Sequence, residues 1–188
     1  MSSGQFTPAD LAAKAALAGY SWLALELDAF DNEPRWPAFA SACRNEGVSP
    51  GIWTTDGGEV YRTPADSDFL IAEVEGPGDL AGLVSELPNL PPIPRAIVTT
   101  FYGFQSASKP YDPALAKPLI DEGFRCLTEC YIGANPNTTP ENMDGIAKQL
   151  GWKTSQPVFG IFAGKTLADY QQWQDWPGCS VWLAEFVL

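Results

Sequence analysis

Hydrophobic and polar positions along the chain change repeatedly from a helical period to a strand period. Residues 7–18 are rich in Ala and Leu and end at Gly19, whereas residues 22–28 (WLALELD) place their three leucines at every second position. A helix repeats about every 3.6 residues and a strand every two, so the pattern predicts a helix followed by a strand. Thr7-Pro8-Ala9-Asp10 strengthens the helix start, because it combines an N-cap residue, a proline in the first turn and an early acid.

The same change recurs along the rest of the chain. Strands are predicted at residues 22–28, 51–55, 68–75, 95–101, 124–132, 157–162 and 180–187, and further helices at 33–46, 79–87, 112–123, 139–150 and 166–175. Seven strands separated by helices or compact links are typical of a parallel sheet with right-handed crossovers.

Such a sheet either closes into a barrel or stays open and doubly wound. Neither a G-x-G-x-x-G nor a G-x-x-x-x-G-K-[ST] motif follows any predicted strand, so the nucleotide-binding argument for an open sheet is missing. We therefore predict an α/β fold, a compact TIM-like (β/α) barrel of seven or eight parallel strands in one domain over residues 1–188. With 188 residues against roughly 250 in a full barrel, it must be trimmed, and an eighth strand would fall in residues 5–6 or 56–62.

The charge balance narrows the class of partner. With 11 basic and 23 acidic residues the net charge is −12, and this field repels phosphate backbones and anionic membranes, so neither nucleic acid nor a membrane is expected as a partner. The chain has no long apolar run and no basic, hydrophobic leader at its start. We expect a soluble protein without a signal peptide.

The residue types available for catalysis are few. The chain has no histidine, which excludes a Ser-His-Asp triad, a Cys-His pair and a histidine-ligated zinc site. Cys43, Cys126, Cys130 and Cys179 have no CxxC spacing and are predicted to be buried free thiols. No EF-hand-like loop supports a calcium site, so no metal and no cofactor are predicted. Catalysis by carboxylate groups is therefore the remaining possibility.

Acidic residues gather where the predicted strands end, which is where parallel barrels carry their active sites. Side chains alternate between the two faces of a strand, so Glu73 and Glu75 share one face, as do Glu129 and Tyr131. In both strands this face is opposite the one suited to helix packing. The strand-end acids are Glu26, Asp28, Glu73, Glu75, Glu129 and Glu185. Buried like charges are costly, so such a cluster points to function.

Part of this cluster has a structural alternative. Glu26 and Glu73 also fit as polar residues inside the barrel, paired with Arg95, Arg125 or the hydroxyls of Thr99 and Thr100. Asp31, Asp56 and Glu59 are expected to be solvated loop acids or helix caps. The functional expectation therefore rests on Glu75, Glu129 and Glu185.

Glycoside hydrolysis is one use of such a cluster, because it needs a proton-donating acid, a second carboxylate and aromatic rings that stack on sugars. We expect Glu75 and Glu129 as acid and nucleophile or base, with Glu185 as a third catalytic candidate. The substrate-binding candidates are Asp28, Glu73, Tyr102, Tyr131 and Trp53. An aldolase- or isomerase-like enzyme ranks lower, because the lysines fall in predicted helices or loops.

Five strand segments share a common texture of apolar residues and strand-end acids: 22–28, 51–53 (GIW), 69–75 (FLIAEVE), 127–129 (LTE) and 182–185 (WLAE). In these segments the chain resembles compact glycosidase-like TIM-barrel modules in tail-associated proteins of phages that infect actinobacteria. The resemblance implies binding and hydrolysis of a host-surface polysaccharide or oligosaccharide, contact with other virion proteins, and a virion-associated or cytoplasmic location. The alternative is a non-catalytic virion or tail barrel whose acids are structural or bind a cation.

Overall fold

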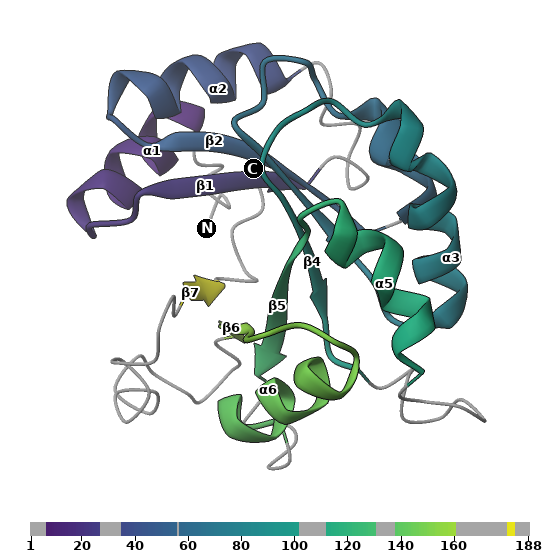
Figure 1. The fold of residues 1–188 in the computed structure, drawn as a ribbon. Helices are drawn as coiled ribbons and strands as arrows, with labels where there is room; N and C mark the ends of the chain where they lie inside the picture. Colours follow the sequence, from purple (N-terminus) through teal and green to yellow (C-terminus); the bar gives the residue numbers. More distant parts are fainter. Residues whose placement is uncertain are drawn as a thin grey trace, which may run out of the picture.

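The structure is a computed structural model with a mixed α/β architecture (Figure 1). It describes residues 7–26, 35–55, 57–101, 112–130, 138–160 and 180–182. The α-helices are α1 (Pro8–Leu17), α2 (Trp36–Asn45), α3 (Pro77–Glu86), α5 (Pro113–Asp121) and α6 (Pro140–Gln149). The strands are β1 (Trp22–Glu26), β2 (Ser49–Thr54), β3 (Phe69–Glu73), β4 (Arg95–Thr99), β5 (Arg125–Cys130), β6 (Gln156–Gly160) and β7 (Ser180–Trp182).

All strand pairs are parallel, and the strands lie in the sheet in the order of the chain, from β1 to β7. Strands β1 to β6 form a curled half-barrel, and the three-residue β7 pairs with β6. The prediction of a parallel α/β fold is confirmed. The predicted closure into a full barrel is not confirmed, because within the described segments no strand pairing joins β7 to β1.

Two segments, residues 5–6 and 56–62, were considered for an eighth strand. Residues 57–62, considered for an eighth strand, form the 3-10 helix η2 (Gly57–Arg62), so that prediction is wrong. A second 3-10 turn, η3 (Leu87–Asn89), follows α3. Residues 5–6, the predicted helix at 166–175 and the continuation of the last strand beyond residue 182 lie outside the described residues.

The two ends of α1 have the local signals that the sequence indicates, whereas α3 begins two residues earlier than predicted, at Pro77. Thr7 caps α1 with a full capping box: its side chain accepts a hydrogen bond from the Asp10 amide, and the Asp10 carboxylate accepts one from the Thr7 amide. Gly19 and Gly151 follow helix ends with φ of 81° and 109°, a left-handed conformation that glycine adopts without strain. These local signals hold in the folded chain because they depend on neighbouring residues only.

The helices pack on the convex face of the curled sheet, with α1 and α2 over β1 and β2, and α6 beside β5 (Figure 1). The main core lies in this layer and includes the outward strand residues Leu25, Ile52, Leu70 and Ile97. Cys43, Cys126 and Cys130 are buried free thiols in the same layer, as expected, whereas Cys179 lies outside the described residues. No helix in the described segments has both the length and the apolar character to cross a membrane.

The concave face of the sheet carries a second, smaller apolar cluster. It consists of Trp53, Ile71, Ala96, Val98, Leu127 and Val158, with Trp22, Ala24 and Phe69 packed against it. Near its base the Phe69 ring lies over Gly51, where a Cβ atom would overlap the ring, and meets Trp22 edge to face at 5.4 Å between centroids. The concave face therefore combines this apolar cluster with polar side chains at the ends of the strands.

Candidate functional site

Strand register brings three of the predicted polar positions into one row. Glu73 pairs with Val98, and Thr99 pairs with Thr128. Continuing the two registers places Glu75, Thr100 and Glu129 side by side at the C-terminal ends of neighbouring strands. Leu127, two residues before Glu129, belongs to the concave cluster, and side chains alternate along a strand, so Glu129 also lies on the concave face. The predicted inward orientation of these acids is confirmed.

Glu73 lies one step below this row, half-buried beside Trp53. The Trp53 indole Nε1 donates a hydrogen bond of 3.1 Å to Glu73 Oε2. Burial raises the pKa of Glu73 above its ordinary value, and although the Trp53 hydrogen bond lowers it, the charges of Glu75, Glu26 and Asp79 raise it further. Glu73 is thus a carboxyl group whose environment favours its protonated form.

Glu75 has a more open environment, because it lies two residues beyond the end of β3 and is exposed. The Thr100 hydroxyl donates a hydrogen bond of 3.0 Å to Glu75 Oε2. The Glu75 amide donates to Asp79 Oδ2 at 3.0 Å, just before α3 begins. Thr100 therefore holds the Glu75 carboxylate at the rim of the half-barrel, and Asp79 of α3 holds the Glu75 backbone there.

Glu129 is the most deeply placed of the three acids. It is 1% exposed, and both of its carboxylate oxygens are inaccessible to solvent. Buried carboxyl groups at strand ends are costly and are therefore concentrated at functional sites, although structural networks also contain them.

The arginine partners considered for Glu73 are elsewhere. Arg95 pairs with Leu70 in the register, which places it on the convex face; there it donates to the Pro91 carbonyl at 2.7 Å and lies 3.9 Å from Glu122 Oε2. Arg125 begins β5, at the opposite end of the strand from Glu129. The predicted pairing of Glu73 with an arginine is therefore wrong, and the hydrogen-bond partner of Glu73 is the Trp53 indole.

Two features of the site were not foreseen from the sequence. Trp53 was expected to contact substrate; it is 7% exposed, and its indole N–H donates to Glu73. Phe101, directly after Thr100, has a φ of 59°, which is unusual for a bulky residue, and its amide donates a hydrogen bond of 3.0 Å to the Thr99 hydroxyl oxygen. Backbone strain of this kind concentrates at ligand-binding positions, and the sequence carried no signal for it.

Four of the predicted site residues lie outside the described residues: Asp28, Tyr102, Tyr131 and Glu185. Their roles remain predictions. Glu26 is described and is exposed at the end of β1, level with Trp53.

Backbone spacing sets the range of carboxyl separations at the site. Glu73 and Glu75 are two residues apart on one strand face, which puts their Cα atoms about 6.6 Å apart, and Glu75 and Glu129 are two strands apart, which is about 9.5 Å. Hydrolysis of a glycoside needs carboxyl groups about 5–5.5 Å apart for retention or about 6.5–9.5 Å apart for inversion. Both pairs have backbones within reach of these separations.

The fold and site together define a parallel α/β half-barrel with a cluster of carboxylates at the C-terminal ends of β3 and β5. In the segments that the structure describes, no group of three or more His, Cys, Asp or Glu side chains is arranged to hold a metal ion. No protein-family model, no curated protein and no solved structure matches this chain. Any function must therefore be argued from the geometry of the site itself.

Proposed function

We propose that this chain is a glycoside-hydrolase-like module that binds a polysaccharide at the C-terminal ends of β3 to β5 and hydrolyses it with their carboxylates. The observation that supports the proposal most directly is the difference between Glu73 and Glu75, which project from the same face of one strand. Glu73 is half-buried with a raised pKa, whereas Glu75 is exposed at the rim. Two carboxyl groups in unlike environments are what acid and base roles require.

Under this proposal Glu73 is the proton donor to the leaving oxygen. A donor must hold its proton near the working pH, and burial moves the pKa of Glu73 in that direction. Trp53 holds the carboxyl group in place through its indole N–H and so acts as a positioning residue. This refines the expectation from the sequence, in which Glu73 only contacted substrate.

Glu75 is the second carboxylate, which attacks the sugar or activates water. Thr100 fixes its orientation with a hydrogen bond to one oxygen and leaves the other free of that contact. Glu129, in the same row two strands away, is the third carboxyl group of the proposed site. Asp28, Tyr102, Tyr131 and Glu185 complete the proposed sugar-binding rim.

The proposed substrate class is a surface polysaccharide of an actinobacterial host, and it rests on the sequence resemblance alone and not on the geometry of the site. The experiment is a reducing-sugar assay on such cell-wall polymers with wild type, Glu73→Gln, Glu75→Gln and Glu129→Gln. Each of the first two substitutions should lower kcat by about 10²- to 10⁴-fold while polymer binding persists. Glu46→Gln, an exposed acid after α2, is the matched control and should keep full activity. Absence of turnover by wild type on every polymer would overturn the proposal.

One observation favours a second candidate, a non-catalytic virion barrel with structural acids. Both oxygens of Glu129 are covered, which suits an internal polar contact as well as catalysis. In that case Glu129→Gln lowers the free energy of unfolding, wild type shows no turnover, and Glu73→Gln leaves polymer binding and assembly with other tail proteins unchanged. The assay and a denaturation curve on the same variants separate the two candidates.

A further inference from the structure

The last residue of β4 and the two residues after it lie between the main core and the carboxylate site. These residues are Thr99, Thr100 and Phe101, and all three are buried. Thr100 contacts the site directly, because its hydroxyl donates a hydrogen bond of 3.0 Å to Glu75 Oε2. Whatever holds Thr100 in place therefore also affects the orientation of the Glu75 carboxylate.

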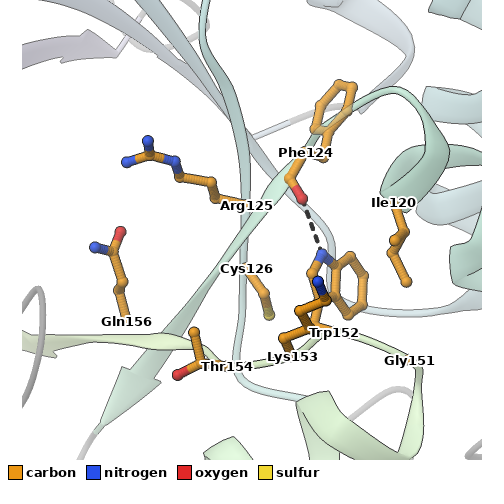
Figure 2. Close-up of a pocket in the computed structure, with 9 residues that line it drawn as sticks. All are labelled: Ile120, Phe124, Arg125, Cys126, Gly151, Trp152, Lys153, Thr154 and Gln156. Atoms are coloured by element: carbon orange, nitrogen blue, oxygen red, sulfur yellow. Dashed lines mark hydrogen bonds between the residues drawn. The ribbon is translucent and has the colours of Figure 1, made fainter.

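Side chains along β4 and β5 alternate between the two faces of the sheet. Ile97 and its register partner Cys126 belong to the main core on the convex face. Thr99 and Thr128 lie two residues further along and are also in register, so both lie on this face. Figure 2 shows the same alternation at the start of β5, where the side chains of Arg125 and Cys126 project to opposite sides of the strand. Thr99 is thus separated by the sheet from the carboxylates on the concave face.

Phe101 combines a buried side chain with an unusual backbone conformation. Its φ of 59° lies in the left-handed region, which a bulky residue adopts only where its surroundings hold it there. Its ring is fully buried in the main core, and its amide donates a hydrogen bond of 3.0 Å to the Thr99 hydroxyl oxygen. Thr99 and Phe101 therefore close a tight turn with Thr100 at its centre.

The backbone of Thr100 is held on both sides. Before it, β4 is paired with both neighbouring strands: the Val74 amide donates to the Val98 carbonyl at 2.9 Å, and Val98 and Thr99 are in register with β5. After it, the hydrogen bond from Phe101 to Thr99 holds the turn. A β-branched threonine has few χ1 rotamers, so a fixed backbone leaves few directions for its hydroxyl. The direction in which Thr100 donates therefore depends on the turn.

Thr128 provides a comparison for Thr99 within the same layer. The two residues are register partners, and both side chains are 0% exposed. The Thr128 hydroxyl has no hydrogen-bond partner within the described part of the chain, whereas the Thr99 hydroxyl accepts the Phe101 amide. Valine would suit a buried strand position at least as well as threonine, because it buries no hydroxyl. The hydroxyl of Thr99 is therefore explained by the turn and not by packing.

We propose that Thr99 is a positioning residue of the carboxylate site, which orients Glu75 through the Phe101 turn and the Thr100 hydroxyl. The inference rests on the proposed function, in which Glu75 attacks the sugar or activates water. Such a carboxylate must present an oxygen to the reacting atom, and small displacements of reacting groups lower turnover strongly. Thr99 acts from the opposite face of the sheet and does not contact the substrate.

The test compares wild type with Thr99→Val, Thr99→Ser and Thr128→Val in the full chain. Thr99→Val removes the acceptor and nearly keeps the shape, whereas Thr99→Ser keeps the hydroxyl. Thr128→Val is the matched loss of a buried hydroxyl on the same face. The first readout is kcat and KM in the reducing-sugar assay. The second readout needs no hydrolysis: NMR follows the ¹³C resonance of the Glu75 side-chain carboxyl and the hydrogen exchange of the Phe101 amide.

Thr99→Val should lower kcat by about 10- to 10²-fold and change KM by less than about twofold, because it displaces a reacting group and leaves the sugar-binding rim unaltered. Thr99→Ser should restore most of the lost activity, and Thr128→Val should match wild type. In Thr99→Val the Glu75 carboxyl resonance should shift and the Phe101 amide should exchange faster. Neither change is expected in Thr99→Ser or Thr128→Val.

The NMR readout separates this inference from the proposed function. A shifted Glu75 resonance in Thr99→Val alone supports the positioning role even if wild type shows no turnover, a result that overturns the hydrolysis only. An unchanged Glu75 resonance in Thr99→Val, or equal losses of activity in Thr99→Val and Thr128→Val, would overturn the positioning role. If Thr99→Val does not fold, hydrogen exchange in wild type decides: an unprotected Phe101 amide overturns the inference, and a protected one supports it.

Discussion

The indole nitrogen of Trp53 donates a hydrogen bond of 3.1 Å to Oε2 of Glu73, which joins β2 to β3 across the concave face of the sheet. The bond stabilises the ionised carboxylate, yet burial outweighs it, and the pKa of Glu73 stays above its ordinary value. This balance between a donor and a desolvated environment sets the protonation state of the acid to which the proposed mechanism assigns the proton.

Trp53→Phe should raise the pKa of Glu73 further, because the substitution removes a donor to the charged form and keeps the aromatic packing. Carboxyl ¹³C NMR across a pH titration measures the shift. Trp22→Phe is the matched control, since Trp22 lies on the same face and contacts Phe69. An unchanged or lower pKa of Glu73 in Trp53→Phe would show that the hydrogen bond has no influence on this group.

Glu73 should also make the stability of the protein depend on pH. Its pKa is raised in the folded state, so the folded chain binds this proton more tightly than the unfolded chain. The resulting stabilisation is present below the unfolded pKa of about 4.5 and is lost as the pH rises through the folded value. Urea unfolding of wild type and Glu73→Gln should therefore show the glutamine variant gaining relative stability as the pH rises from about 4.5 through the folded pKa of Glu73. A constant difference would contradict the raised pKa.

Asp144→Asn should lower the free energy of unfolding by about 1–3 kcal/mol at neutral pH. Burial alone would raise the pKa of Asp144, but hydrogen bonds from Lys148 and Ser155 outweigh it and hold the pKa below its ordinary value. The stabilisation is therefore present above the unfolded pKa and is lost as the pH falls through the folded one. Urea unfolding at neutral and acidic pH measures both the size and the direction.

A matched ion pair on α5 provides the control for that experiment. Lys117 and Asp121 also lie 2.6 Å apart at i and i+4, but both side chains are exposed. Asp121→Asn should change the unfolding free energy by no more than about 0.5 kcal/mol. Equal losses in the two variants would mean that burial of Asp144 contributes nothing.

Gly51→Ala should destabilise the protein by about 1–3 kcal/mol, because the added Cβ overlaps the Phe69 ring inside the half-barrel. The double variant Gly51→Ala with Phe69→Leu should recover part of this loss, which thermal and urea unfolding both measure. Gly78→Ala in α3 is the comparison, since its Cβ meets no atom within 4 Å. That variant should gain stability by about 0.4–1 kcal/mol.

The elements of the fold were predictable because their signals are local. The capping box at Thr7 and the glycine that ends α1 both depend on hydrogen bonds and backbone freedom within a few residues. The parallel order of the strands followed from the alternation of elements. Residues 57–62 were harder, since a short segment without clear period fits a strand or a 3-10 turn, and contacts with β3 and α3 accompany the helical form.

Only the orientation of the acids at the site was predictable from the sequence. Side chains alternate every residue along a strand, and this alternation was enough to place Glu73 and Glu75 on one face and to point Glu129 inward. The partner of each acid was not predictable, because contacts between strands depend on register and curl. Arg95 fitted as a partner of Glu73 in the sequence, but its register with Leu70 turns it toward the helices.

The sequence by itself determined the parallel α/β plan, the acidic character and the set of carboxylates available at the strand ends, because these follow from composition and from local periodicity. Only the tertiary structure decided which acid is half-buried, which is exposed and which is covered. Burial and hydrogen-bond partners arise when strands far apart in the chain pair and curl, as Trp53 and Glu73 do.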